Sequence, residues 1–170
     1  MNTLTRRFAG LLMTTMVFGS PAVLCADSPD PVPFPADYRS WALVRSIVVL
    51  PASQFFDKRG GIHHYYANDL AMEGYRTGQF PAGSIIVDEA VVTHKGEGPA
   101  EGILLEDATR FLEVMRRFDD RYADTGGWRY QRFEGTDPAG QLTDSDQAHC
   151  FGCHRSAQDH DYVFSRPRTR

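Results

Sequence analysis

Two cysteines and a histidine near the end of the chain form its most chemically telling pattern. Cys150 and Cys153 flank two residues, and His154 follows the second cysteine at once, giving CFGCH. This spacing lets two thiols reach the two vinyl groups of a haem while the adjacent imidazole falls under the iron. The motif predicts one covalently attached haem c, with Cys150 and Cys153 as attachment residues and His154 as the metal ligand.

Two other interpretations use the same residues. A zinc site would take Cys150, Cys153 and two of His149, His154 and His160 as ligands. Zinc sites with such spacing usually include a second cysteine pair, which this chain lacks. A thioredoxin-type redox pair would be expected early in the chain, after the first strand of a βαβ unit. Haem attachment is therefore the leading prediction.

The side of the iron opposite His154 decides what such a haem could do. Electron-transfer cytochromes usually place a methionine there, commonly downstream of the attachment site, but the last methionine of this chain is Met115. The remaining choices are an open or water-filled position, which binds small ligands, or a second histidine, which favours electron transfer. The candidate histidines are His63, His64, His94 and His160.

The first residues predict export. Residues 1–26 carry Arg6 and Arg7, then a mostly apolar run over 8–18, then a small-residue cleavage site, which is the pattern of a secretory signal peptide. The apolar run is shorter than the roughly 20 residues that cross a bilayer. We expect a periplasmic protein with no membrane span.

The chain after the signal peptide has the length of a single domain, and it is mildly acidic. Cleavage leaves 144 residues and moves the formal charge from -4 to -6, because two arginines leave. An acidic protein is a poor partner for nucleic acid or an anionic membrane.

Cys25 leaves with the peptide, and Leu24 before it disfavours lipidation. We expect 27–37 to be an extended proline-rich segment and 38–170 a single haem-binding domain.

Alternating and β-branched residues predict a sheet ahead of the haem motif. Strands are expected over 40–50, 62–67, 84–93 and 128–134. Asn68 is expected to cap a helix over DLAMEGY. The segment 108–118 fits helical spacing better than strand alternation. These elements predict an α+β fold, mainly an antiparallel β-sheet with packed helices.

Several short blocks along the chain share their order with a known family. They are Pro35-Ala36-Asp37-Tyr38-Arg39-Ser40-Trp41, Tyr66-Ala67-Asn68, Phe80-Pro81-Ala82-Gly83, Val87-Asp88-Glu89, Arg121-Tyr122-Ala123, Gly127-Trp128 and CFGCH with Val163-Phe164. The chain thus resembles the cytochrome P-460 and cytochrome c'-beta family of exported monohaem proteins. The resemblance implies an antiparallel sheet with helices, a homodimer, and a five-coordinate haem with a restricted hydrophobic distal pocket. It also implies a strand over 111–115, against the helical spacing.

One position separates this chain from its catalytic relative. Cytochrome P-460 itself oxidises hydroxylamine and carries a lysine crosslinked to a meso carbon of its haem, and that lysine falls in the block 87–89. This chain has Asp88 there, and an aspartate cannot form the nitrogen crosslink. Lys95, seven residues on, is interpreted as a solvated loop residue. The resemblance therefore predicts a haem without the crosslink.

Two carboxylates are candidates for the haem pocket. The resemblance assigns a proton-handling role to the glutamate that matches Glu113. In a strand, Glu113 shares a face with Met115, and Asp88 shares a face with Ile86. We therefore expect Ile86 and Asp88 beside the cofactor, with Glu113 and Asp88 as catalytic candidates that titrate as a pair. Surface salt bridges with the many arginines are the alternative.

Three functions follow from these residues. The first is a gas-binding protein like cytochrome c'-beta, whose open iron captures nitric oxide, and the missing lysine favours it. The second is an oxidoreductase like cytochrome P-460, acting on hydroxylamine or peroxide, with Glu113 or Asp88 as proton acceptor. The third is a bis-histidine cytochrome that passes electrons to a partner protein.

Overall fold

The computed structural model describes residues 30–118, 120–141 and 144–168. The predicted signal peptide, residues 1–26, lies outside the described residues, as does the first part of the predicted segment 27–37. Among the helices that the structure describes, none is long and apolar enough to cross a membrane.

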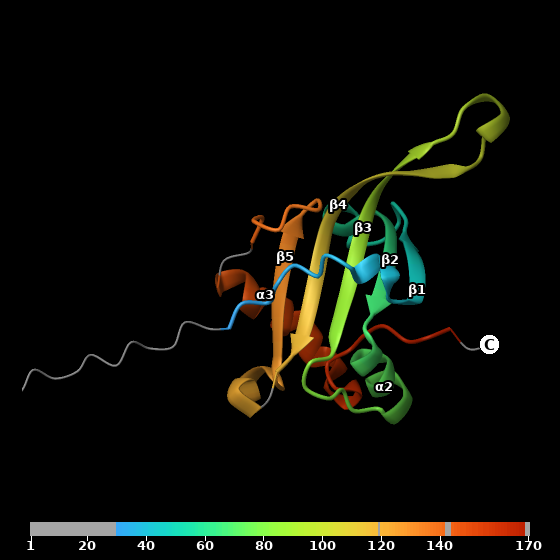
Figure 1. The fold of residues 1–170 in the computed structure, drawn as a ribbon. Helices are drawn as coiled ribbons and strands as arrows, with labels where there is room; N and C mark the ends of the chain where they lie inside the picture. The colour runs from blue at the N-terminus through green and yellow to red at the C-terminus, as the bar shows by residue number, and fades with distance from the viewer. Residues whose placement is uncertain (1–29, 119, 142–143, 169–170) are drawn as a thin grey trace, which may run out of the picture. The chain divides into compact units, whose positions relative to one another are not determined.

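The described residues form one antiparallel sheet of five strands in sequence order, which is a meander (Figure 1). The strands are β1 Ala42–Val49, β2 Gly61–Ala67, β3 Ile85–Lys95, β4 Leu104–Arg117 and β5 Trp128–Glu134. The α-helices are α1 Phe56–Arg59, α2 Asp69–Thr77 and α3 Asp144–His154, and the 3-10 turns are η1 Tyr38–Ser40, η2 Gly98–Ala100, η3 Asp120–Thr125 and η4 Arg155–His160. The predicted fold class is confirmed.

Helix α2 begins where its cap was predicted. The Asn68 side chain accepts a hydrogen bond from the backbone N–H of Ala71 at 2.9 Å, which satisfies one of the unpaired donors of the first turn. The helix ends at Gly78, whose φ of 85° is the left-handed conformation that glycine adopts without a steric cost. The predicted cap is therefore confirmed.

Residues 108–117 of the segment 108–118 belong to a strand, so the helical spacing was misleading. Within β4, Leu112 and Val114 pack on one face of the sheet, whereas Phe111 and Met115 face the other. Both faces are covered, so residues on both faces are apolar and the alternation that marks a half-exposed strand is lost. The strand implied by the resemblance is confirmed.

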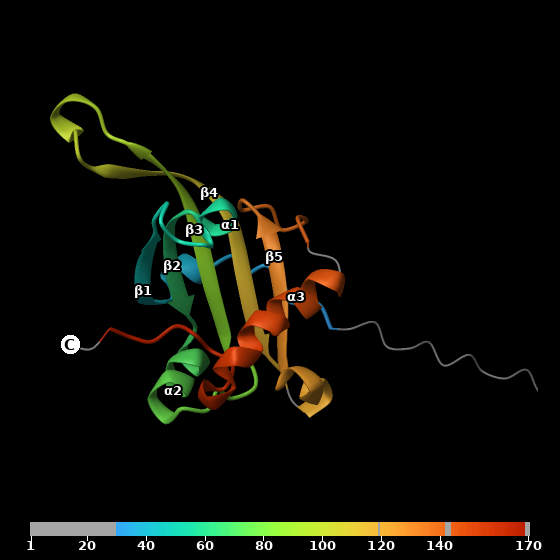
Figure 2. The same ribbon diagram turned by 180° about the vertical axis from the view of Figure 1, so that it is seen from behind.

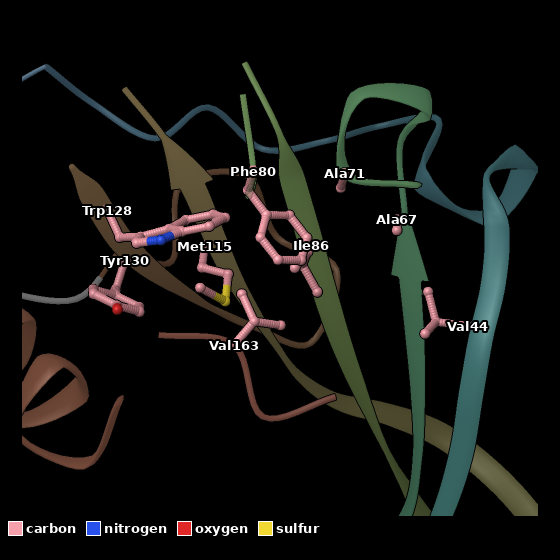
Figure 3. Close-up of a cluster of buried hydrophobic side chains, with 9 residues drawn as sticks. All are labelled: Val44, Ala67, Ala71, Phe80, Ile86, Met115, Trp128, Tyr130 and Val163. Atoms are coloured by element: carbon pink, nitrogen blue, oxygen red, sulfur yellow. The ribbon is translucent and has the colours of Figure 1, made fainter. Parts of the chain in front are cut away.

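Each face of the sheet carries its own buried cluster. One cluster comprises Val32, Tyr38, Val87, Leu112, Val114, Phe118 and Phe133. The N-terminal segment covers it, with Val32 only 2% exposed, and crosses in front of the sheet in Figure 1. The other comprises Val44, Ala67, Ala71, Phe80, Ile86, Met115, Trp128, Tyr130 and Val163 (Figure 3). Helix α3 and the C-terminal segment cover this side (Figure 2), which we call the α3 face.

Strands β3 and β4 continue beyond the sheet as a two-stranded arm (Figures 1 and 2). The pairing runs out to Lys95 opposite Leu104, and register shifts on both sides of Val91 mark the bulge at which the arm begins. Exposed apolar residues gather there: Val92, Ile103, Leu104 and Leu105.

Candidate functional site

The CFGCH motif forms the C-terminal end of α3. Cys150 is half-buried against the apolar cluster of the α3 face, Cys153 is exposed, and no disulfide joins the two. Residues three apart are neighbours on a helix surface. Both thiols can therefore reach one bound group, as haem attachment requires.

His154 is oriented by a hydrogen bond to the backbone. Its Nδ1 lies 2.7 Å from the carbonyl oxygen of Tyr162. A carbonyl oxygen only accepts, so Nδ1 carries the hydrogen and Nε2 keeps its lone pair, which is the state that a metal-ligating imidazole needs. Burial lowers the pKa of His154, which favours this neutral ring.

The turn at Asp161 and Tyr162, which carries the carbonyl that bonds to His154, is strained and is held by hydrogen bonds. Asp161 and Tyr162 have φ values of 53° and 65°, a left-handed conformation that residues other than glycine rarely adopt. The indole N–H of Trp128 donates to the Asp161 carbonyl at 2.9 Å, and the Phe80 backbone N–H donates to the Asp161 side chain at 2.8 Å. The core of the α3 face thus fixes the partner of His154.

Two aromatic rings flank His154. The ring centroids of Tyr130 and Phe164 lie 4.8 Å and 5.1 Å from that of His154. Burial raises the pKa of Tyr130, which keeps its hydroxyl protonated, and this buried hydroxyl has no hydrogen-bond partner among the described residues. Phe164 is 55% exposed. A haem fits this arrangement, because the unsatisfied Tyr130 hydroxyl and the exposed Phe164 ring lie beside the His154 imidazole. Cys150, Cys153 and His154 would hold the haem.

Asp88 and Glu113 lie directly opposite each other on β3 and β4. Asp88 is buried and Glu113 is half-buried. The next pair on the same face is Ile86 with Met115, and both belong to the apolar cluster of the α3 face. The structure therefore brings the two candidate carboxylates together, with Ile86 beside them on the face that His154 also occupies.

Arg59 links the two carboxylates. Its two terminal nitrogens donate separately, one to Asp88 Oδ2 and the other to Glu113 Oε2. The planar fork of a guanidinium suits such a bridge. Surface salt bridges with arginine were the expected alternative, and the structure shows an arginine salt bridge whose Asp88 side chain is only 9% exposed. Sequence reasoning missed Arg59, which lies in a four-residue helix with no motif around it.

His63 completes this charged cluster from β2. Its side chain is 0% exposed, its Nδ1 lies 2.8 Å from Asp88 Oδ1, and its Nε2 lies 2.7 Å from the carbonyl oxygen of Arg59. Both ring nitrogens are therefore engaged, and His63 does not offer one to an iron atom. We call His63, Asp88, Arg59 and Glu113 the Arg59 cluster.

The other three candidate axial histidines lie elsewhere. His64 follows His63 on the strand and bonds to the Ser46 hydroxyl at 2.8 Å and to Glu106 at 2.8 Å. His94 is exposed on the arm, 3.8 Å from Asp107. His160 is exposed at the end of η4. The bis-histidine alternative therefore finds little support.

The Arg59 cluster lies within electrostatic reach of His154. After burial and the bond to Tyr162, the charges of Glu113, Arg59 and Asp88 also act on the pKa of His154. The zinc alternative lacks a ligand set, since no three His, Cys, Asp or Glu side chains among the described residues converge as a metal site requires. The α3 face thus combines a histidine with a free Nε2 lone pair, two thiols and a partly buried charged cluster.

Comparison with known proteins agrees with this arrangement. The family model of cytochrome P460 matches residues 35–165, a range that contains the Arg59 cluster and the CFGCH motif. No curated protein shows a significant match to the chain. On this match, with the five-stranded antiparallel sheet and the C-terminal CxxCH motif, the chain belongs to the cytochrome P460 family.

Proposed function

We propose that this protein is an exported c-type cytochrome with one haem, whose iron binds nitric oxide on the side opposite His154. Family membership implies a c-type haem, and the cysteine spacing agrees with it. The observation that carries the proposal is the hydrogen bonding of His154, which is half-buried, and of His63, which is buried. Tyr162 leaves Nε2 of His154 ready to ligate, whereas both nitrogens of His63 are engaged. A haem held by His154 would then keep an open position for a small ligand.

An absorption spectrum of the purified protein tests the open position. Ferric and ferrous protein should both show five-coordinate, high-spin iron, and the ferrous form should bind nitric oxide tightly. Six-coordinate, low-spin iron in both oxidation states would reject the proposal, because a second side chain would then occupy the position.

A second candidate function is oxidation of hydroxylamine or reduction of peroxide. The observation that favours it is the bridge from Arg59 to Asp88 and Glu113, which holds two carboxylates as proton acceptors on the face of His154. The bound haem would supply the redox chemistry. Electrons from hydroxylamine would leave to a partner protein, and the electrons that reduce peroxide would come from one.

Two turnover assays separate the two candidates: hydroxylamine with an artificial electron acceptor, and peroxide with an artificial electron donor. Glu113→Gln keeps the size of the side chain but removes the proton acceptor, so an enzyme should lose turnover. Glu134→Gln is the matched control, because Glu134 lies on the neighbouring strand with its side chain 72% exposed. Absence of hydroxylamine or peroxide turnover in the wild-type protein, alongside tight nitric oxide binding, would leave the gas-binding function.

We also propose a periplasmic homodimer. The signal-peptide pattern of residues 1–26 supports export. The arm supports the dimer, since an isolated two-stranded ribbon is marginally stable and its exposed apolar residues need a covering surface, for which a second copy is the proposed partner. Leu104→Lys should convert the dimer to a monomer in light scattering, whereas Leu50→Lys, at an exposed site beyond the end of β1, should not.

A further inference from the structure

The hydrogen-bond partners of His63 determine its protonation. Nε2 faces the carbonyl oxygen of Arg59, which only accepts, so Nε2 carries a hydrogen. Nδ1 faces Oδ1 of Asp88, whose other oxygen accepts from the Arg59 guanidinium. Because the Arg59 guanidinium on its other oxygen favours the charged carboxylate, the proton between Asp88 and Nδ1 belongs on the imidazole. His63 is then an imidazolium with both N–H groups donating.

This assignment balances the charges of the Arg59 cluster. Two cations, His63 and Arg59, stand against two anions, Asp88 and Glu113. A neutral His63 would leave the cluster with one net negative charge on the face of His154. Buried charges without partners are costly, so a balanced cluster is the stable arrangement.

We infer that His63 is a positioning residue that, as a buried cation, pairs with Asp88 and keeps the Arg59 cluster electrically neutral beside the haem. Loss of the His63 proton makes the cluster negative, which stabilises ferric over ferrous iron and lowers the midpoint potential. The inference rests on the proposed haem at His154. It needs neither nitric oxide binding nor hydroxylamine turnover.

Several groups that surround His63 could affect whether its ring is protonated. Tyr65 on β2 stacks at 6.5 Å, and burial raises its pKa, so it stays neutral. On β4, Phe111 lies edge-on at 6.1 Å, and Arg132 of β5 lies over the Phe111 ring. Burial and the Arg59 charge lower the pKa of His63, but the hydrogen bond and charge of Asp88 outweigh them and raise it.

Redox potentiometry of the haem-containing protein tests the inference. The midpoint potential of the wild-type protein is measured from about pH 5 to pH 9 and should fall as pH rises through the pKa of His63, which lies above 6.5. In His63→Gln that step should vanish, while steps from other groups, such as haem propionates, persist in both proteins. His64→Gln is the matched control, because His64 is the next residue and also contacts a carboxylate. It should keep the wild-type curve.

The results of the potentiometry can be distinguished from the results that test the proposed function. Superimposed curves for wild type and His63→Gln would overturn the inference, as would equal loss of the step in His64→Gln. If His63→Gln does not fold, the wild-type curve decides, since the absence of any step above pH 6.5 would overturn the inference. Six-coordinate iron in the absorption spectrum would instead reject the open position and leave the potential measurable.

Discussion

Replacing Asp88 with asparagine should cost the protein more stability than any surface charge would. Asp88 accepts hydrogen bonds from His63 and Arg59, and its side chain is only 9% exposed. Charge-assisted hydrogen bonds contribute about 1.5–3 kcal/mol each. Asparagine can still accept one of them through its carbonyl oxygen, so the expected loss is about 3 kcal/mol, within the range for breaking a buried ion pair.

Equilibrium denaturation near neutral pH measures this loss in the haem-containing protein. For a domain of this size, about 3 kcal/mol corresponds to roughly 10 °C in Tm. The matched control is Asp107→Asn, because Asp107 also faces a histidine, but at 3.8 Å and with its side chain 63% exposed. Its replacement should leave stability unchanged, since exposed ion pairs contribute little.

Equal stability of the Asp88→Asn and Asp107→Asn proteins would refute the reasoning. It would mean that Asp88 is solvated in solution and that the Arg59 cluster is not a buried unit. A second check is the wild-type pH profile. The folded-state pKa of His63 is raised, so its stabilising effect is complete below pH 6.5 and is lost as pH rises through the folded pKa.

Three further changes test the other contacts. Asn68→Ala removes the acceptor for the Ala71 N–H and a donor to the Gly83 carbonyl, so denaturation should show a loss of about 2 kcal/mol. Cys153→Ala should keep haem attached through a single thioether, seen by mass spectrometry and a shifted haemochrome band; an unchanged band would contradict the attachment. Burial alone would raise the pKa of Glu89, but hydrogen bonds from Arg39 and other donors lower it. Its stabilising effect is present above pH 4.5 and lost below, so Glu89→Gln should flatten the acid limb of the stability profile.

Local chemistry allowed several features to be predicted from the sequence. The CFGCH spacing predicts haem attachment because two thiols and an imidazole must meet one flat ligand at fixed separations. The Asn68 cap was predictable because a short polar side chain before a helix satisfies backbone donors three residues on. Strand β5 was predicted over its full length, since its alternating residues follow a sharp glycine turn.

The contacts among the charged groups of the Arg59 cluster depend on the tertiary structure and could not be predicted from the sequence. Periodicity failed over β4 because both faces of the sheet are covered, and the strand then lacks an alternation of polar and apolar residues. Arg59 lies 29 residues from Asp88 and 54 from Glu113 in the sequence. Antiparallel pairing and the loop between β1 and β2 bring the three together. The sequence alone predicted the haem attachment, because its three groups are neighbours in the chain. The Arg59 cluster required the fold, because its members come from four separate elements.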